Sequence, residues 1–258
     1  MLGCIVRDAD EVALAADLPV DYLELKGDML CVDAASRQAL RNRLEAAGPP
    51  ATAMTSPLPR RFGCRVVGDD ANHARALDVF GDMCDRAAPL GVRTVVLGSG
   101  QARSVPAGFP MDRAVVQFRD FVTEAAAACR ARGMALTLEP LAGIETNLVN
   151  SCAEARPLVD GLASTGLRIA VDYYHVVTEG LSVTEELTAA AGAIGHAHTS
   201  SVPRGSLRFD EDMQARFIAG LSAAGYTDRL TIEEEFTDFA REAPAAVGIF
   251  RRLLGEQA

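Results

Sequence analysis

Short apolar runs alternate with helical patterns along the whole chain. Eight runs read as strands, at residues 3–6, 22–25, 52–55, 94–97, 135–138, 168–171, 194–198 and 230–234. Helix signals fall between them: Asp33 precedes a run that ends at Gly48, and Ser151 and Ser182 have the spacing of capping boxes. A length of 258 residues is also usual for one barrel of eight strand–helix units. We therefore expect an α/β fold, a single (β/α)8 TIM barrel over residues 1–258, with its active site at the C-terminal ends of the strands.

One helical segment shows its expected buried face clearly. From Asp112 onward, apolar residues recur at steps of three and four until Gly133: Val115, Phe118, Val122, Ala126 and Cys129. This period is typical of a helix that packs against a parallel sheet. We expect these residues to face the barrel.

Charge and cysteine content narrow the class of protein. The formal net charge of -10 opposes binding to polyphosphate, so we expect no nucleic-acid partner and no membrane partner. The six cysteines are widely spaced, with no CxxC pair, and most lie in apolar segments, which favours reduced thiols in a cytoplasmic protein. No targeting segment or long apolar span is evident.

Four of the expected strands end in residues that bind metals. Glu139, Asp172, His198 and Glu234 each follow an apolar run, at spacings close to one strand–helix repeat. The C-terminal ends of barrel strands face one shared crevice, so these side chains should converge. Three crowded carboxylates need a cation to stay ionised together. This mostly hard ligand set suits one divalent metal ion, Mn2+, Mg2+ or Co2+, with Zn2+ less typical.

Each residue also has a plainer interpretation. Glu139 or Glu234 alone could be a solvated acid at a strand end, Asp172 could cap a helix, and His198 could be a hydrogen-bonded core histidine. Glu24, near the end of the second strand, points toward the same mouth but could equally form an ion pair with another barrel residue. Four such coincidences at barrel spacing favour the metal site.

Several motifs in this order resemble the xylose isomerase-like TIM-barrel family, which includes ketose 3-epimerases and hydroxypyruvate isomerase. The resemblance covers nearly the whole chain. The motifs are Leu138-Glu139-Pro140-Leu141, Glu145-Thr146-Asn147, Val171-Asp172-Tyr173-Tyr174-His175, Gly195-His196-Ala197-His198 with Arg204, and Ile232-Glu233-Glu234-Glu235-Phe236.

The resemblance implies roles for these positions. Glu139, Asp172, His198 and Glu234 would be the metal ligands, and His175, Arg204 and Glu145 would contact substrate. A metal that polarises a substrate carbonyl stabilises an enediolate, and Glu139 and Glu234 would act as acid and base on its two faces. The implied activity is a sugar isomerase or epimerase that acts on a small ketose or keto acid.

Other functions remain open at this stage. The same barrel and metal support a dehydratase of the inosose or dehydroshikimate type, and a non-catalytic sugar-binding barrel is a further alternative. An endonuclease IV-like activity is disfavoured because that branch uses additional histidines that the corresponding segments here lack. Many relatives carry Asn-Arg where this chain has Ala142-Gly143, so the substrate stays open. A homodimer or homotetramer is compatible with the fold.

Overall fold

The computed structural model describes residues 1–255 and shows a closed barrel of eight parallel strands in sequence order. All eight expected strands are present. Their bounds are Leu2–Val6 (β1), Tyr22–Lys26 (β2), Ala51–Thr55 (β3), Thr94–Leu97 (β4), Ala135–Leu138 (β5), Arg168–Asp172 (β6), Ile194–Thr199 (β7) and Leu230–Ile232 (β8). The pairing of β1 with β8 closes the barrel, which confirms the predicted (β/α)8 class.

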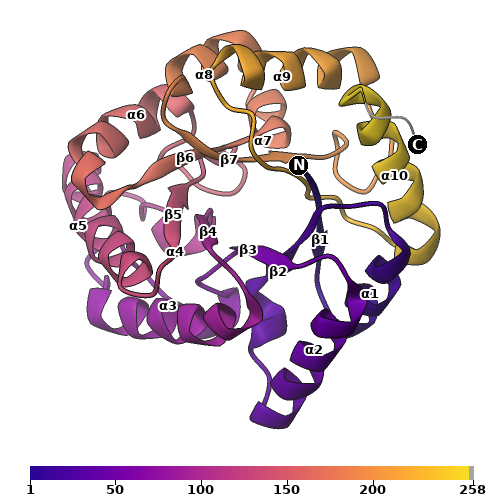
Figure 1. Cartoon of the computed structure of the whole chain (residues 1–258). Helices are drawn as coiled ribbons and strands as arrows, with labels where there is room; N and C mark the ends of the chain where they lie inside the picture. The colour runs from indigo at the N-terminus through magenta and orange to yellow at the C-terminus, as the bar shows by residue number, and fades with distance from the viewer. Residues whose placement is uncertain (256–258) are drawn as a thin grey trace.

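Helices form a ring around the strands (Figure 1). Their bounds are Ala9–Leu14 (α1), Ala34–Ala47 (α2), His73–Ala87 (α3), Gly100–Arg103 (α4), Met111–Arg130 (α5), Cys152–Gly161 (α6), Tyr173–Thr178 (α7), Val183–Ala190 (α8), Glu211–Ala223 (α9) and Phe239–Leu253 (α10). Five short 3-10 turns lie between them, at Ala15–Asp17, Gly27–Leu30, Arg60–Phe62, Ala88–Leu90 and Ala163–Thr165. None of the helices in the described part of the chain is long and apolar enough to span a membrane.

Side-chain caps fix where several helices begin. Asp33 accepts a hydrogen bond from the Ser36 amide at the start of α2. Ser151 and Ser182 accept hydrogen bonds from amides three residues later, at the starts of α6 and α8. These caps satisfy amides that the first helical turn leaves free. The predicted helix starts are therefore confirmed.

The apolar core lies between the strands and the ring of helices. Buried aromatic side chains from four helices fill it: Phe80, Phe118, Phe121, Phe217 and Phe250. On α5 the expected face is right except at its first position, because Val115 is 39% exposed and Ala114 takes the buried place. Burial of these side chains is the main favourable contribution to folding.

The barrel interior is polar near the C-terminal ends of β2, β5, β6, β7 and β8. Successive strand residues point to opposite faces, so positions two apart share the interior. On β7 this places His196 and His198 inside, and on β2 it places Glu24 and Lys26 inside. The same alternation on β8 turns Thr231 inward, and Thr231 hydrogen-bonds to Glu24 across the barrel.

Candidate metal centre and active site

Four buried side chains converge at the C-terminal ends of β5 to β8. They are Glu139, Asp172, His198 and Glu233, and one ligand-type atom from each lies within 4.8 Å of those of the other three. His198 Nδ1 lies 2.9 Å from Glu139 Oε1 and 3.0 Å from Glu233 Oε2. The cluster can supply one nitrogen and three carboxylate oxygens to a single divalent cation.

Glu233, and not the predicted Glu234, joins this cluster in the structure. Strand β8 ends at Ile232, and the inward phase set by Thr231 continues to Glu233, two residues later. Glu234 points away from the cluster. Its carboxylate accepts hydrogen bonds from the amides of Ser201, Gly205 and Glu235, so it holds the loop after β7.

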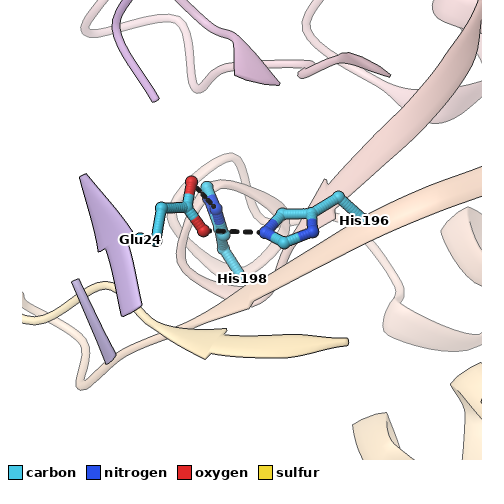
Figure 2. Close-up of side chains that lie close together, drawn as sticks. All are labelled: Glu24, His196 and His198. Atoms are coloured by element: carbon cyan, nitrogen blue, oxygen red, sulfur yellow. Dashed lines mark hydrogen bonds and ion pairs between the residues drawn. The ribbon is translucent and has the colours of Figure 1, made fainter. Parts of the chain in front are cut away.

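A second polar cluster lies on the other side of His198. Figure 2 shows both imidazole rings directing Nε2 at the Glu24 carboxylate, at 2.8 Å from His196 and 3.0 Å from His198. Thr231 donates a hydrogen bond to the same carboxylate at 2.6 Å, and Tyr22 is paired with Thr231. The three side chains in Figure 2 are fully buried.

Glu24 determines how His198 can act. A carboxylate accepts hydrogen bonds only, so His198 donates from Nε2, and a neutral His198 ring has its lone pair on Nδ1. That lone pair faces Glu139 and Glu233. Burial lowers the pKa of His198, but Glu24 and Glu233 outweigh it and raise the pKa well above its ordinary value. A cation at Nδ1 would replace a proton there.

Basic side chains balance the acidic cluster. Arg204, in the loop after β7, forms ion pairs with Asp172 and, at 3.1 Å, with Glu233, and its guanidinium lies 4.3 Å above the Tyr174 ring. Burial raises the pKa of Glu233, while Arg204 and His198 lower it and prevail, so its pKa lies well below the ordinary value. Glu233 is therefore ionised at neutral pH.

Asp172 serves two structural roles at once. One oxygen accepts a hydrogen bond from the Tyr174 amide at 2.8 Å and caps α7, as the plainer interpretation allowed. The other oxygen faces Arg204 and lies 3.6 Å from His175 Nε2. A helix cap and a place in the cluster are therefore compatible.

His175 and Glu145 lie together beside the cluster. His175 Nδ1 accepts a hydrogen bond from the Ala142 amide, so the proton of a neutral ring is on Nε2, 4.0 Å from Glu145 Oε1. Burial lowers the pKa of His175 below its ordinary value, which favours the neutral ring. The unusual Ala142-Gly143 pair is fixed here, because Glu179 accepts a hydrogen bond from the Gly143 amide at 2.5 Å.

Close packing after β4 and β5 positions Glu139. A Cβ atom at Gly98 would lie 2.4 Å from Glu139 Oε2, so a larger residue there would displace the carboxylate. The Glu139 carbonyl oxygen accepts a hydrogen bond from buried Arg103 at 2.7 Å. The end of β5 is thus held from its backbone and from its side chain.

A cavity of about 490 Å³ opens above the cluster. Its lining includes Lys26, Arg60, Glu145, Arg204 and Glu235. The volume falls in the range of small-molecule sites. Of the residues predicted to contact substrate, Glu145 and Arg204 line this cavity, and His175 lies just below them, near Asp172.

Sequence reasoning missed Glu233 as a member of the cluster, Glu24 as the partner of both histidines, and Lys26 on the cavity wall. Strand alternation relates Lys26 and Glu233 to a neighbour on the same strand face. Lys26 is two residues after Glu24, and Glu233 is two residues after Thr231, so each pair shares a face.

Comparisons with known proteins identify the family of this chain. The model of the family described as xylose isomerase-like TIM barrel matches residues 12–252. A curated relative, the L-ribulose 3-epimerase of Mesorhizobium japonicum (strain LMG 29417 / CECT 9101 / MAFF 303099), is 26% identical over 178 residues. That match covers 67% of this chain and 59% of the relative.

Two solved structures share the fold at low identity. D-psicose 3-epimerase with D-tagatose from Clostridium cellulolyticum H10 has a TM-score of 0.82 at 18% identity and covers 99% of both chains. The IOLI protein with a binding zinc atom has a TM-score of 0.73 at 17% identity and covers 98% of this chain and 96% of that one. With the family model matched over most of its length, the chain belongs to the xylose isomerase-like TIM barrel family.

Proposed function

We propose that the protein is a divalent-metal-dependent sugar epimerase or isomerase that transfers a proton next to a substrate carbonyl. One observation carries the proposal: carboxylates from β5 and β8, Glu139 and Glu233, meet at His198 Nδ1 beneath a polar cavity. The matched L-ribulose 3-epimerase and the structural likeness to D-psicose 3-epimerase support the same class of reaction.

In this proposal Glu139, Asp172, His198 and Glu233 hold the metal, with Glu233 in the place first assigned to Glu234. The donor set fits, because three carboxylates accompany an imidazole whose other nitrogen is already bound to Glu24. The ligands suit Mn2+, Mg2+ or Co2+, and the structural neighbour with a binding zinc atom supports Zn2+ as a further candidate. A bound metal would polarise the substrate carbonyl and stabilise an enediolate.

The protein residues then divide the remaining work. Glu139 and Glu233 come from well-separated strands, so each can address one face of a planar enediolate, one removing the proton and the other returning it. His175 Nε2–H donates to a substrate oxygen. Arg204 and Glu145, both on the cavity wall, orient the substrate hydroxyl groups.

The cellular setting and assembly are part of the same proposal. All six cysteines are free thiols, five of them buried and Cys31 partly buried, which supports a reducing, cytoplasmic location. We propose a small-molecule sugar as the partner of the site. A homodimer or homotetramer stays a prediction.

Deuterium exchange tests the proposed function. The protein, loaded with Mn2+, is incubated in deuterated water with D-ribulose, D-ribulose 5-phosphate, hydroxypyruvate and an inosose, and deuterium at carbon is followed by NMR. We expect deuterium incorporation without loss of water from at least one ketose or keto acid. Loss of water from the inosose would favour the dehydratase instead, and no exchange with any compound would contradict both.

A further inference from the structure

Lys26 is the only lysine in the chain, so it carries the only primary amine among the side chains. Every other permanently cationic side chain is an arginine. The two differ physically, because lysine presents a compact ammonium with three rotatable donors, whereas arginine presents a rigid planar fork. This single side-chain ammonium lies on the wall of the candidate active site.

The fold places Lys26 beside the carboxylate of Glu233. It is the last residue of β2, on the same inner face as Glu24, and its Nζ lies 3.5 Å from Glu233 Oε1. The following backbone is fixed, since a Cβ atom at Gly27 would lie 2.3 Å from the Ser56 carbonyl oxygen. Its side chain is 32% exposed and faces the cavity.

The ammonium of Lys26 has three N–H donors, more than its single ion pair with Glu233 uses. Among residues 1–255 it makes no hydrogen bond to the protein, and Glu233 is its one ion-pair partner. Arg204, by contrast, is bound to Asp172 and Glu233 and stacks on Tyr174. Lys26 is therefore free to donate to a molecule in the cavity.

A second cation lies on the same wall. Arg60, exposed in the segment after β3, lines the cavity, and its side chain has no ion pair or hydrogen bond within the described residues. The nearby acid Asp28 is paired with Arg61 at 3.1 Å. Lys26, which is paired with Glu233, and Arg60 thus place two cationic groups on the β2–β3 side of the cavity.

We propose that Lys26, assisted by Arg60, binds an anionic group of the substrate, a carboxylate or a phosphate. The protein then acts on a sugar acid or sugar phosphate in preference to a neutral ketose. This inference deepens the proposed function and rests on it. A charge-assisted hydrogen bond in a partly buried site is strong enough to set such a preference.

Binding of compounds that are not turned over tests the preference directly. Calorimetry compares erythritol with D-erythronate and with D-erythritol 4-phosphate, for the protein with Mn2+ and without it. We expect at least one anion to bind about tenfold or more tightly than erythritol, in line with the strength of a charged hydrogen bond. The two anions distinguish a carboxylate from a phosphate.

Three variants connect the preference to this residue. Lys26→Met should reduce the ratio of anion to erythritol affinity to about twofold or less, as expected when a charged hydrogen bond is lost. Lys26→Arg keeps the charge and should retain part of the ratio, which guards against a misfolded variant. Arg119→Met removes an exposed cation from α5, far from the cavity lining, and should leave the ratio unchanged.

Two results would overturn the inference: erythritol binding as tightly as both anions, or Lys26→Met preserving the ratio. Deuterium exchange separates this failure from that of the proposed function. Deuterium exchange with D-ribulose, together with equal binding of neutral and anionic compounds, would contradict only the role of Lys26 and not the proposed function. Absence of deuterium exchange with any substrate would contradict the proposed function, while the ratio of anion to erythritol affinity would still test the role of Lys26.

Discussion

The two sides of His198 present similar chemical groups to very different surroundings. At Nδ1 the carboxylates of Glu139 and Glu233 lie beneath a cavity of about 490 Å³ and are accompanied by Arg204. At Nε2 the carboxylate of Glu24 is enclosed with His196 and Thr231, and no cavity-lining residue belongs to that group. Because only the Nδ1 side lies beneath the cavity, we place the metal and the substrate there and assign to the enclosed side the orientation of His198.

Hydrogen bonds stabilise the closed polar cluster inside the barrel. A buried carboxylate is costly unless it is hydrogen-bonded, and Glu24 accepts from two histidines and a threonine. In return it fixes the ring of His198. The enclosed side positions the residue, and the open side is where we place the chemistry.

The largest expected effect separates two adjacent residues. Glu233→Gln should lower the deuterium-exchange rate by about a thousandfold, because it removes a metal ligand and a proton-transfer group. Glu234→Gln should act through the Arg204 loop, with a smaller loss that appears mainly in substrate KM. Exchange rates and bound metal are measured for both. Equal loss in the two variants would contradict the division of roles.

Glu24→Gln should weaken metal binding by about tenfold to a hundredfold, since the partner of a metal-binding histidine tunes its basicity and orientation. Saturating metal should restore much of the exchange rate. Competition with a fluorescent chelator gives the affinity. Total loss of activity at saturating metal would assign Glu24 to the open side instead.

The stability of metal-stripped protein should be greatest near pH 6.5, the ordinary pKa of histidine. Below that pH, the lowered pKa of His175 means that the unfolded chain takes up a proton that the folded protein does not, so stability falls. Above it, the raised pKa of His198 means that the unfolded chain loses its proton first, so stability falls on that side as well.

Thermal unfolding across the pH range, with chelator and with Mn2+, checks this behaviour. Metal replaces the proton on Nδ1, so Mn2+ should remove the alkaline decline and leave the acid one. A metal-free protein whose stability stays level from pH 6.5 to 9 would show that His198 does not hold its proton as its surroundings predict.

The smallest effect concerns the packing behind Glu139. Gly98→Ala should lower metal affinity several-fold with little change in melting temperature, because the added Cβ displaces a flexible carboxylate rather than backbone. Gly248→Ala is a matched control, since it lies in α10 with no atom within 4 Å of the added Cβ. It should raise stability slightly and leave metal affinity unchanged. Identical metal affinity in both variants would contradict a role of Gly98 in positioning the Glu139 carboxylate.

The fold could be predicted from local pattern to a large extent. All eight strands and the caps at Asp33, Ser151 and Ser182 follow from period and spacing, which depend on nearby residues. Glu139, Asp172 and His198 were placed together because parallel strands bring their C-terminal ends to one crevice.

The features that the sequence did not predict depend on contacts between distant residues. Three consecutive glutamates follow Ile232, and the strand alternation decides which of them points into the barrel. The contact of Thr231 with Glu24 shows that Thr231 points inward, and this contact is known only from the structure. The pairing of Glu24 with His198 spans 174 residues, so no local pattern contains it. The position of Lys26 on the cavity wall could not be predicted, because residues of several other segments form that cavity.

Anomalous scattering from Mn2+-soaked crystals tests the central claim most directly. We predict a single metal peak per chain, bound by Glu139, Asp172, Glu233 and Nδ1 of His198, with Glu24 still accepting a hydrogen bond from Nε2. A peak among Glu24, His196 and Nε2 of His198, or one bound by Glu234, would contradict it.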